Sequence, residues 1–552
     1  MRFRRPGRAD VRAAARKHFG WKTLRAGQEE AVRALLAGRD TLVVMPTGAG
    51  KSAVYQLAGL LIDGPTVVIS PLISLQRDQL AGLARHGDAG LEGVAVNSAQ
   101  PAAATEQAWS SLTTGEAEFV FLAPEQLANE TVVERLATAG VSLLVVDEAH
   151  CVSAWGHDFR PDYLRIADVL ERLGRPTVVA LTATASPPVR EEIVDRLRMR
   201  EPELVVQGFD RPNLHLGVQR FTQARHKEDA VLDQAAALTS ELGGSGIVYT
   251  ATRKGTERYA AALVERGVPA AAYHGGMAAA EREQVHHGFL DSSVRVVVAT
   301  SAFGMGIDKP DVRFVLHADI AESLDSYYQE IGRAGRDGQP ARAVLLYRSE
   351  DVGLRSFFAS GGPDLDTITQ VADAVRAHRG ATPGELKEEL SLTHTRLTHA
   401  VNLLEQAGAL AFDGAGHLTY TDPSVPTAAA VAAAGQVAGS HEAVDRSRVE
   451  MMRGYAETSG CRRQFLLGYF GETLPGPCGN CDVCEERVVD VRDAVVDGPY
   501  ALNDRVVHRE WGPGVVMRPE PDRVTVLFES VGYRTLALAA LEADHGLLAT
   551  EP

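Results

Sequence analysis

The stretch DTLVVMPTGAGKSAVYQLAGLLI, residues 40–62, decides the fold. An apolar run ends at Met45, a Gly-rich loop follows, and a helical segment continues from Ser52. Backbone N–H groups of such a loop point at phosphate oxygens, and the helix start adds partial positive charge. The pattern is partial, because Met45 stands where the full phosphate loop has a further Gly, and a Gly-Lys-Ser can occur in a loop by chance. The residues predicted to bind the nucleotide phosphates are Thr47, Gly48, Gly50, Lys51 and Ser52.

An acidic pair supplies the other half of this predicted site. Asp147 and Glu148 follow the apolar run VSLLVV. With Lys51 neutralising the phosphates, Ser52 and Asp147 are suited to hold Mg²⁺, and Glu148 can orient or deprotonate the attacking water. The alternative is a solvated Asp-Glu pair that merely ends a strand. Both elements in their strand–loop context favour nucleotide hydrolysis.

Apolar runs alternate with helical segments over about residues 38–210 and again over about 211–347. Strands buried on both faces with helices between them are typical of parallel sheets in α/β domains. We therefore expect two tandem α/β lobes, residues 1–210 and 211–360, with a ligand cleft between them. The predicted strands are DTLVVM, TVVIS, GVAVN, FVFLAP, LLVVDE and TVVALTAT in the first lobe, and GIVYT, VRVVVAT, VRFVLH and ARAVLLY in the second.

The pattern changes after residue 360. Three helical segments and a hairpin predict a winged-helix-like module at 361–425, and an Ala- and Pro-rich stretch, DPSVPTAAAVAAAGQVAGS, predicts a linker. A helical, cysteine-bearing subdomain is expected at 441–490, and about four short strands predict a small SH3- or Tudor-like barrel at 500–552.

Four of the five cysteines are spaced C-x16-C-x2-C-x2-C, at Cys461, Cys478, Cys481 and Cys484. Four thiolates suit tetrahedral Zn²⁺ in a structural site, although an iron–sulfur cluster uses four thiolates too. The odd total and the absence of an export signal argue against a disulfide framework. The adjacent Arg462 and Arg463 either face DNA phosphates or brace their helix.

Bulk composition excludes few functions. The chain has 552 residues and a net charge of -16, yet residues 1–25 hold nine Lys or Arg and one acid. Such an arm either contacts phosphates or is a solvated tail. Apolar stretches fall short of the roughly 20 residues that span a bilayer, so we expect a cytoplasmic protein.

The stretch YYQEIGRAGRDG in the second lobe contains Gln329, Arg333 and Arg336. Arginines three apart on a helix share a face. If that face looks across the cleft, one guanidinium can stabilise the transferring phosphoryl group as an arginine finger, so hydrolysis would require the lobes to close.

Seven motifs follow one another over roughly residues 18–350: LRAGQEEAV, MPTGAGKS, SPLISLQRDQ, DEAHCVSAWGHDFRP, LTATAS, ATSAFGMGIDKPDVRFVLH and YYQEIGRAGRDG. Through these motifs the chain resembles the RecQ DNA helicases of superfamily 2, which have two RecA-like lobes. This resemblance favours zinc over an iron–sulfur cluster and implies an ATP-dependent enzyme that moves 3′ to 5′ on single-stranded DNA and unwinds duplexes in DNA repair or recombination, in the bacterial cytoplasm at the nucleoid. The resemblance implies that adenine is bound by Trp21, Arg25 and Gln28. It also implies that Arg336 is the arginine finger and that Arg333 couples the two lobes. A relay between the nucleotide and DNA would be formed by Thr182 and Thr184.

The resemblance also implies that the loop after the acidic pair senses single-stranded DNA. Trp155 and Phe159 offer faces for base stacking, with His157 and Arg160 beside them. The alternative is that the two aromatic rings pack beneath the loop. Because the loop begins a few residues after Glu148, DNA binding can reposition that carboxylate.

Two features depart from the family's usual order. The winged-helix-like module precedes the zinc cysteines. Its third helix faces a nucleic-acid groove, contacts protein or acts as a brace, and carries His394, Arg396, His399 and Asn402. The stretches RVVHREWGPGVV and VTVLFES in the predicted C-terminal barrel resemble a Tudor-like module that contacts RNA polymerase in some bacterial superfamily 1 helicases. The alternative is a generic SH3-like barrel that docks on its own chain. Two other functions stay open: an RNA helicase or duplex translocase, and a DNA or polymerase tether with a vestigial ATPase.

Overall fold

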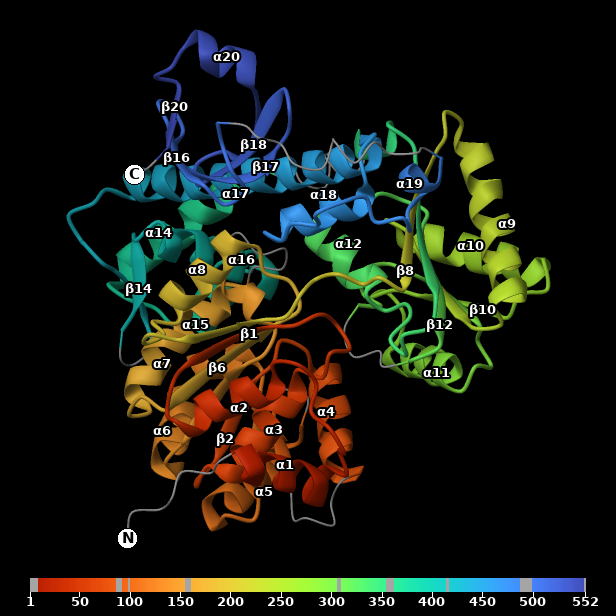
Figure 1. Cartoon of the computed structure of the whole chain (residues 1–552). Helices are drawn as coiled ribbons and strands as arrows, with labels where there is room; N and C mark the ends of the chain where they lie inside the picture. Colours follow the sequence, from red (N-terminus) through yellow and green to blue (C-terminus); the bar gives the residue numbers. More distant parts are fainter. Residues whose placement is uncertain are drawn as a thin grey trace.

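Two parallel β-sheets form the centres of the two predicted lobes (Figure 1). The computed structural model describes residues 8–85, 92–97, 100–153, 160–304, 309–353, 362–413, 416–486 and 499–550. Within these residues, no helix combines the length and apolar character that crossing a bilayer requires.

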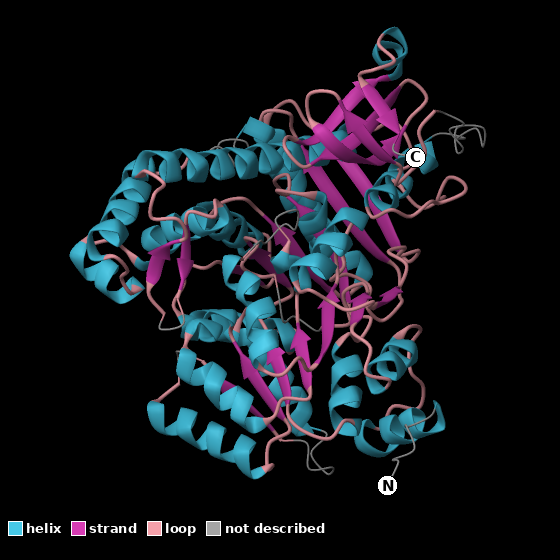
Figure 2. Cartoon of the chain, turned by 90° about the vertical axis from the view of Figure 1, so that its left-hand side faces the viewer, coloured by secondary structure: helices cyan, strands magenta, loops and turns pink. Residues whose placement is uncertain are grey.

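Lobe 1 contains a seven-stranded sheet in the order β3-β4-β2-β5-β6-β1-β7. Helices flank the sheet (Figure 2), so the strands β1, β2, β4 and β5 are buried along their whole length. Because β1 and β5 both pair with β6 in parallel, the phosphate loop after β1 and the acidic pair after β5 emerge at the same edge of the sheet. The strands are β1 (Thr41–Val44), β2 (Thr66–Ile69), β3 (Gly93–Val96), β4 (Phe119–Leu122), β5 (Leu143–Val146), β6 (Thr177–Thr182) and β7 (Glu203–Val206), and the helices are α1 (Arg8–Phe19), α2 (Gln28–Leu36), α3 (Ser52–Leu61), α4 (Ile73–Arg85), α5 (Ala102–Thr114), α6 (Glu130–Ala139), α7 (Ile166–Arg172) and α8 (Pro187–Arg196), with short 3₁₀ turns η2 (Pro124–Ala128), η3 (Ala149–Val152) and η4 (Pro161–Arg165).

Lobe 2 contains a six-stranded sheet in the order β10-β11-β9-β12-β13-β8. All its strand pairs are parallel, as the buried apolar runs predict. The strands are β8 (Leu214–Arg220), β9 (Ser245–Tyr249), β10 (Ala270–Tyr273), β11 (Val296–Ala299), β12 (Val312–His317) and β13 (Ala341–Tyr347), and the helices are α9 (Ala224–Leu242), α10 (Arg253–Glu265), α11 (Ala279–Leu290) and α12 (Leu324–Ile331).

The module predicted at 361–425, here called the insert, has the expected three helices and hairpin. These are α14 (Leu365–His378), α15 (Pro383–Glu389), α16 (His394–Gln406), β14 (Leu410–Phe412) and β15 (Leu418–Tyr420). The insert has its own hydrophobic core, which includes Leu386, Leu404 and Leu418.

The linker prediction is wrong, because residues 427–457 form one helix, α17 (Thr427–Glu457). Ala is the best helix former, and the buried residues Ala430, Ala434 and Ala438 lie four apart, so they form a stripe that packs on the insert. The other end of α17 reaches lobe 2, where Tyr455 hydrogen-bonds Tyr327 over 3.2 Å. The helix therefore spans from the insert to lobe 2. It is followed by α18 (Arg462–Tyr469) and α19 (Asp482–Glu486).

The C-terminal segment is an antiparallel sheet in the order β19-β18-β17-β16-β20, packed on α17 (Figure 1). The four predicted strands are present, and β20 and α20 are additional. A closed barrel stays a prediction, since β19 and β20 stand at opposite ends of the strand order. The elements are β16 (Arg505–His508), β17 (Gly512–Pro519), β18 (Arg523–Phe528), β19 (Gly532–Ala537), α20 (Leu538–Ala543) and β20 (Leu548–Thr550).

Candidate functional site

The phosphate loop lies between β1 and α3, as predicted. Gly48 and Gly50 have φ angles of 80° and 82°, in the left-handed region that favours glycine. The Lys51 ammonium donates to the carbonyl of Met45 over 3.2 Å, so Met45, where the full pattern has Gly, contributes only backbone here. Burial lowers the pKa of Lys51, and the carboxylates of Glu148 and Asp147 oppose that shift.

The acidic pair faces this lysine. Asp147 accepts hydrogen bonds from the side-chain amide of Gln79 (2.9 Å) and the backbone N–H of Glu148 (3.0 Å). Burial, together with the charge of Glu148, raises the pKa of Asp147 to about 7, against the opposing effect of Lys51. A buried carboxylate at this position is stabilised by a nearby cation. The sequence reasoning missed Gln79, although it lies in the motif SPLISLQRDQ.

Glu148 is joined to the strand β6 through a histidine that the sequence reasoning also missed. The Nδ1 atom of His150 lies 3.4 Å from Glu148 Oε2 and 3.0 Å from Thr182 Oγ1. Thr182 in turn donates to the carbonyl of Thr184 over 3.0 Å. Glu148 itself has a φ of 49°, an uncommon conformation for a non-glycine residue. Of the two predicted relay threonines, Thr182 therefore contacts the histidine beside the carboxylate, and Thr184 is linked to it only through the side chain of Thr182.

Two of the three residues predicted to bind adenine, Arg25 and Gln28, contact the phosphate loop. The Gln28 amide donates to the carbonyls of Gly50 (2.8 Å) and Ala49 (3.2 Å), and the Arg25 guanidinium donates to the carbonyl of Gly48. Trp21 stacks on Phe19 with ring centroids 4.3 Å apart. The side chains of Arg25 and Gln28 thus hold the loop itself.

The two arginines of the second lobe do not share a helical face, and this prediction is wrong. Helix α12 ends at Ile331, and Gly335, with a φ of 62°, turns the chain between the arginines. Arg333 is 2% exposed and lies inside lobe 2 beside Tyr249, whose pKa burial raises and Arg333 lowers. Gln329 stays on α12 and is half-buried.

Arg336 points the other way, at the phosphate loop. Its Cγ and Cδ atoms lie 3.2 Å from the position that a Cβ atom on Gly48 would occupy. A Cβ on the neighbouring Gly332 would lie 3.6 Å from the Cβ of Thr47. The two lobes therefore touch at the phosphate loop, and Arg336 is the arginine of this motif that reaches it.

Three residues of the predicted DNA-sensing loop, Trp155, His157 and Phe159, lie outside the described residues. Their described neighbours are both tied to lobe 1. Ser153 Oγ donates to Glu192 over 2.5 Å, and Arg160 Nη1 donates to the carbonyl of Pro71 over 3.0 Å.

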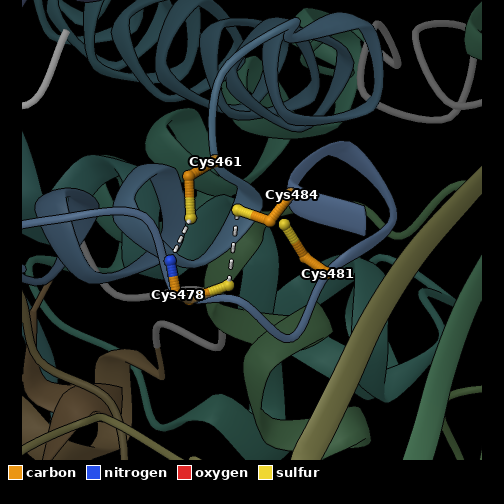
Figure 3. Close-up of side chains that lie close together, drawn as sticks. All are labelled: Cys461, Cys478, Cys481 and Cys484. Atoms are coloured by element: carbon orange, nitrogen blue, oxygen red, sulfur yellow. Dashed lines mark hydrogen bonds between the residues drawn. The ribbon is translucent and has the colours of Figure 1, made fainter. Parts of the chain in front are cut away.

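The four predicted zinc ligands come together (Figure 3), with their sulfur atoms all within 4.8 Å of one another. Zinc with bonds of about 2.3 Å to four tetrahedral sulfurs separates them by about 3.8 Å. The sulfurs of Cys478 and Cys484 lie 3.9 Å apart, so the cluster fits this ion. Backbone N–H groups of Cys478 and Asn480 donate to cluster sulfurs, as they do to thiolates in zinc sites.

Arg462 and Arg463 brace the protein, which is the second of the two alternatives. Both are buried. Arg462 binds Asp482 over 2.6 Å, while Arg463 binds Asp210 over 3.0 Å and the carbonyl of Leu214 over 2.6 Å. In this structure neither guanidinium is presented to a DNA backbone.

The insert contacts lobe 1. The Arg165 guanidinium lies 3.6 Å from Glu405 of α16 and 4.1 Å from the ring centroid of Phe412. At the other end of α16, Arg396 binds Asp364 within the insert, and His399 is exposed. The side chain of His394 lies outside the described residues, and Asn402 is half-buried.

The C-terminal sheet docks on its own chain, as the second reading of this segment predicts. Arg505 pairs with Glu191 of lobe 1 over 2.7 Å, and the Arg518 guanidinium lies 3.9 Å from the ring centroid of Phe465 in the zinc-binding region. Tyr533 lies beside Tyr469, with ring centroids 5.7 Å apart.

Three family models match the chain: DEAD/DEAH box helicase at residues 25–193, helicase conserved C-terminal domain at 227–338, and RecQ zinc-binding at 427–485. The last match begins where α17 begins. Together with the sulfur geometry, it identifies the four cysteines as the zinc site of this family.

Relatives agree with these matches. The chain is 36% identical over 467 residues to the ATP-dependent DNA helicase RecQ of Pasteurella multocida, covering 84% of this chain and 61% of that protein. It is 32% identical over 476 residues to the probable ATP-dependent DNA helicase RecS of Bacillus subtilis, covering 86% and 91%. The chain thus spans about three fifths of the RecQ proteins of Pasteurella multocida and Haemophilus influenzae.

Among solved structures, the DUF1998 helicase MrfA bound to DNA matches with a TM-score of 0.53 at 17% identity, covering 76% of this chain and 63% of that one. This likeness concerns the fold alone. From the sequence relatives and family models, the chain belongs to the RecQ family of helicases.

Proposed function

We propose that this protein is an ATP-dependent DNA helicase that moves 3′ to 5′ on single-stranded DNA and unwinds duplexes during DNA repair or recombination. The observation that carries the proposal is the contact of Arg336, from lobe 2, with Gly48 of the phosphate loop in lobe 1. An ATPase completed only when its lobes meet can convert hydrolysis into relative motion of the lobes.

The proposed chemistry assigns each side chain one task. Lys51 neutralises the β- and γ-phosphates, Glu148 orients the attacking water and takes its proton, and Arg336 stabilises the charge on the transferring phosphoryl group. Mg²⁺ held by Ser52 and Asp147 would neutralise phosphate charge. Trp21, Arg25 and Gln28 bind the adenine, and Arg333, buried in lobe 2, couples Arg336 to that lobe.

The proposed DNA signal reaches the carboxylate through short links. The DNA strand is contacted by Trp155, His157, Phe159 and Arg160. The first of these, Trp155, lies seven residues after Glu148 in the sequence. The contacts of His150 with Glu148 and Thr182 support a relay between nucleotide and DNA. DNA binding would therefore stimulate hydrolysis.

The test compares unwinding of forked, 3′-tailed and 5′-tailed duplexes by the wild type and Lys51→Ala in the presence of ATP. We expect the wild type to unwind the forked and 3′-tailed substrates and Lys51→Ala to unwind neither. Unwinding by Lys51→Ala would contradict the ATP-driven mechanism, and stimulation of ATPase activity by RNA in place of DNA would favour an RNA helicase.

We further propose that the exposed part of the C-terminal sheet contacts RNA polymerase or a repair protein at the bacterial nucleoid, in the cytoplasm. The resemblance to a Tudor-like module supports this, and Val507 on β16 is 38% exposed on that sheet. Binding of the purified chain to purified RNA polymerase, with Val507→Asp as the comparison, tests the proposal. Equal binding of RNA polymerase by the wild type and by Val507→Asp would contradict the proposal.

A further inference from the structure

The segment that joins the two lobes contacts the turn that carries Arg336. This segment, residues 207–213, runs from the end of β7 to the start of β8. Its Arg211 guanidinium donates to the carbonyls of Gly332 (3.3 Å), Ala334 (2.8 Å) and Gly335 (3.1 Å). These carbonyls follow the last turn of α12, where carbonyl groups lack helical partners and attract a cation.

A second residue of the same segment completes the hold. The Asn213 side-chain amide donates to the carbonyls of Gly335 and Gln339, both over 2.9 Å. A Cβ atom on Gly335 would lie 2.5 Å from that amide, so only glycine permits this close approach. Five hydrogen bonds from two side chains thus bind the stretch 332–339, which includes Arg336.

The zinc-binding region holds the joining segment from the opposite side. Arg463, two residues after the zinc ligand Cys461, bonds Asp210 and Leu214 at either side of Arg211. The Glu472 carboxylate accepts the backbone N–H of Phe209 over 3.0 Å. The joining segment is therefore fixed between the zinc-binding region and the arginine turn.

We propose that Arg211 is a positioning residue for ATP hydrolysis, which acts by holding the 332–336 turn so that Arg336 reaches the phosphate loop. This inference rests on the proposed function. Arg211 touches backbone carbonyls and acts through Arg336. A finger displaced by about 1 Å loses on the order of 100-fold in turnover.

The test measures kcat and KM for ATP with saturating single-stranded DNA, together with nucleotide affinity, DNA affinity and melting temperature. The variants are Arg211→Met, which keeps the side chain's length, Arg211→Lys, which keeps its charge, and Asn213→Ala, which removes two of the five hydrogen bonds. The matched control is Arg295→Met, because Arg295 also bonds backbone carbonyls of lobe 2, those of Gly243 and Gly244, away from the turn.

We expect Arg211→Met to lower kcat on the order of 100-fold without changing the KM for ATP or either affinity. Arg211→Lys should have a kcat close to that of Arg211→Met, because one ammonium group cannot span three carbonyls. Arg295→Met should keep the wild-type kcat.

The double variant Arg211→Met/Arg336→Ala decides how Arg211 acts. If it acts through Arg336, the double variant is no slower than Arg336→Ala alone. If the double variant instead lowers kcat by the product of the two single reductions, the positioning role is wrong. It is also wrong if Arg211→Met keeps the wild-type kcat while Arg336→Ala lowers it. Either result would leave the proposed function standing. A wild-type kcat for Arg336→Ala would instead overturn the finger assignment and the inference with it.

Discussion

Gly48→Ala places a methyl group between the lobes, where the phosphate loop meets Arg336. The new Cβ would lie 3.2 Å from Cγ and Cδ of Arg336, so the arginine must move by a few tenths of an ångström. Gly48 also has a φ of 80°, where an L-residue costs roughly 1–2 kcal/mol. The substitution therefore has two effects, one on the fold of lobe 1 and one on the contact between lobes.

The two effects have different sizes and different readouts. The backbone cost is present whether the lobes are open or closed, so it lowers the melting temperature, by about 2–4 °C per kcal/mol for a unit of this size. The contact exists only when Arg336 is at the phosphate loop. At about 100-fold per ångström, a shift of roughly 0.3–0.5 Å lowers kcat about 4- to 10-fold.

Gly140→Ala is the matched control, because Gly140 has a φ of 72° and open space around its Cβ position. Steady-state ATPase assays at saturating DNA should show the lower kcat for Gly48→Ala alone, with similar melting temperatures for the two variants. The deficit should vanish when Arg336→Ala is the background. Equal kcat for the two glycine variants, or a deficit that persists without Arg336, would refute the cross-lobe contact.

Three further predictions concern other parts of the molecule. Cys478→Ser should lose zinc, measured by metal analysis, and with it most of a binding free energy of about 10–16 kcal/mol that supports this region, measured by thermal unfolding; unchanged metal content and stability would reject the zinc site. Trp155→Ala should keep basal ATPase activity and lose its DNA stimulation, and normal stimulation would reject the coupling role. Arg165→Ala should free the insert from lobe 1 without unfolding it, because the insert has its own core; hydrogen exchange should rise along Pro161–Arg165 and stay slow in α16, and no rise would show that the contact is unimportant.

The sequence predicts the interior strands of both lobes and one edge strand, β3, and it misses the other three edge strands. All ten predicted runs in the lobes form strands. The missed strands β7, β8 and β10 each stand at an end of a sheet. An edge strand is covered less completely, so its apolar run is interrupted or weak: Leu204 in β7 is 54% exposed, and β10 contains mainly alanine. Periodicity alone cannot separate such segments from loops.

The site residues were predictable as chemical groups, but their directions were not. Residue type and motif order assign Lys51, Asp147 and Glu148 to one predicted site and the four cysteines to another, and the structure brings each set together. Whether an arginine crosses between lobes depends on the chain's path after a helix ends. Here that path is set at Gly335 by a positive φ and by side chains more than 120 residues away in sequence.

The same reasoning explains why Arg333 and Arg336, three residues apart, have different partners. On a continuous helix both would point into the cleft, and two buried guanidinium groups facing one phosphoryl group would repel each other when ATP is absent. Ending α12 at Ile331 buries Arg333 in lobe 2 and leaves Arg336 to cross alone. Since the carbonyls exposed by that early helix end are bound by Arg211, the break in the helix both separates the arginines and provides the attachment by which the joining segment holds the turn that carries Arg336. Any change in the lobe orientation that moves residues 207–213 must therefore move Arg336 as well, which links the motion between lobes to the arginine that we propose as the finger.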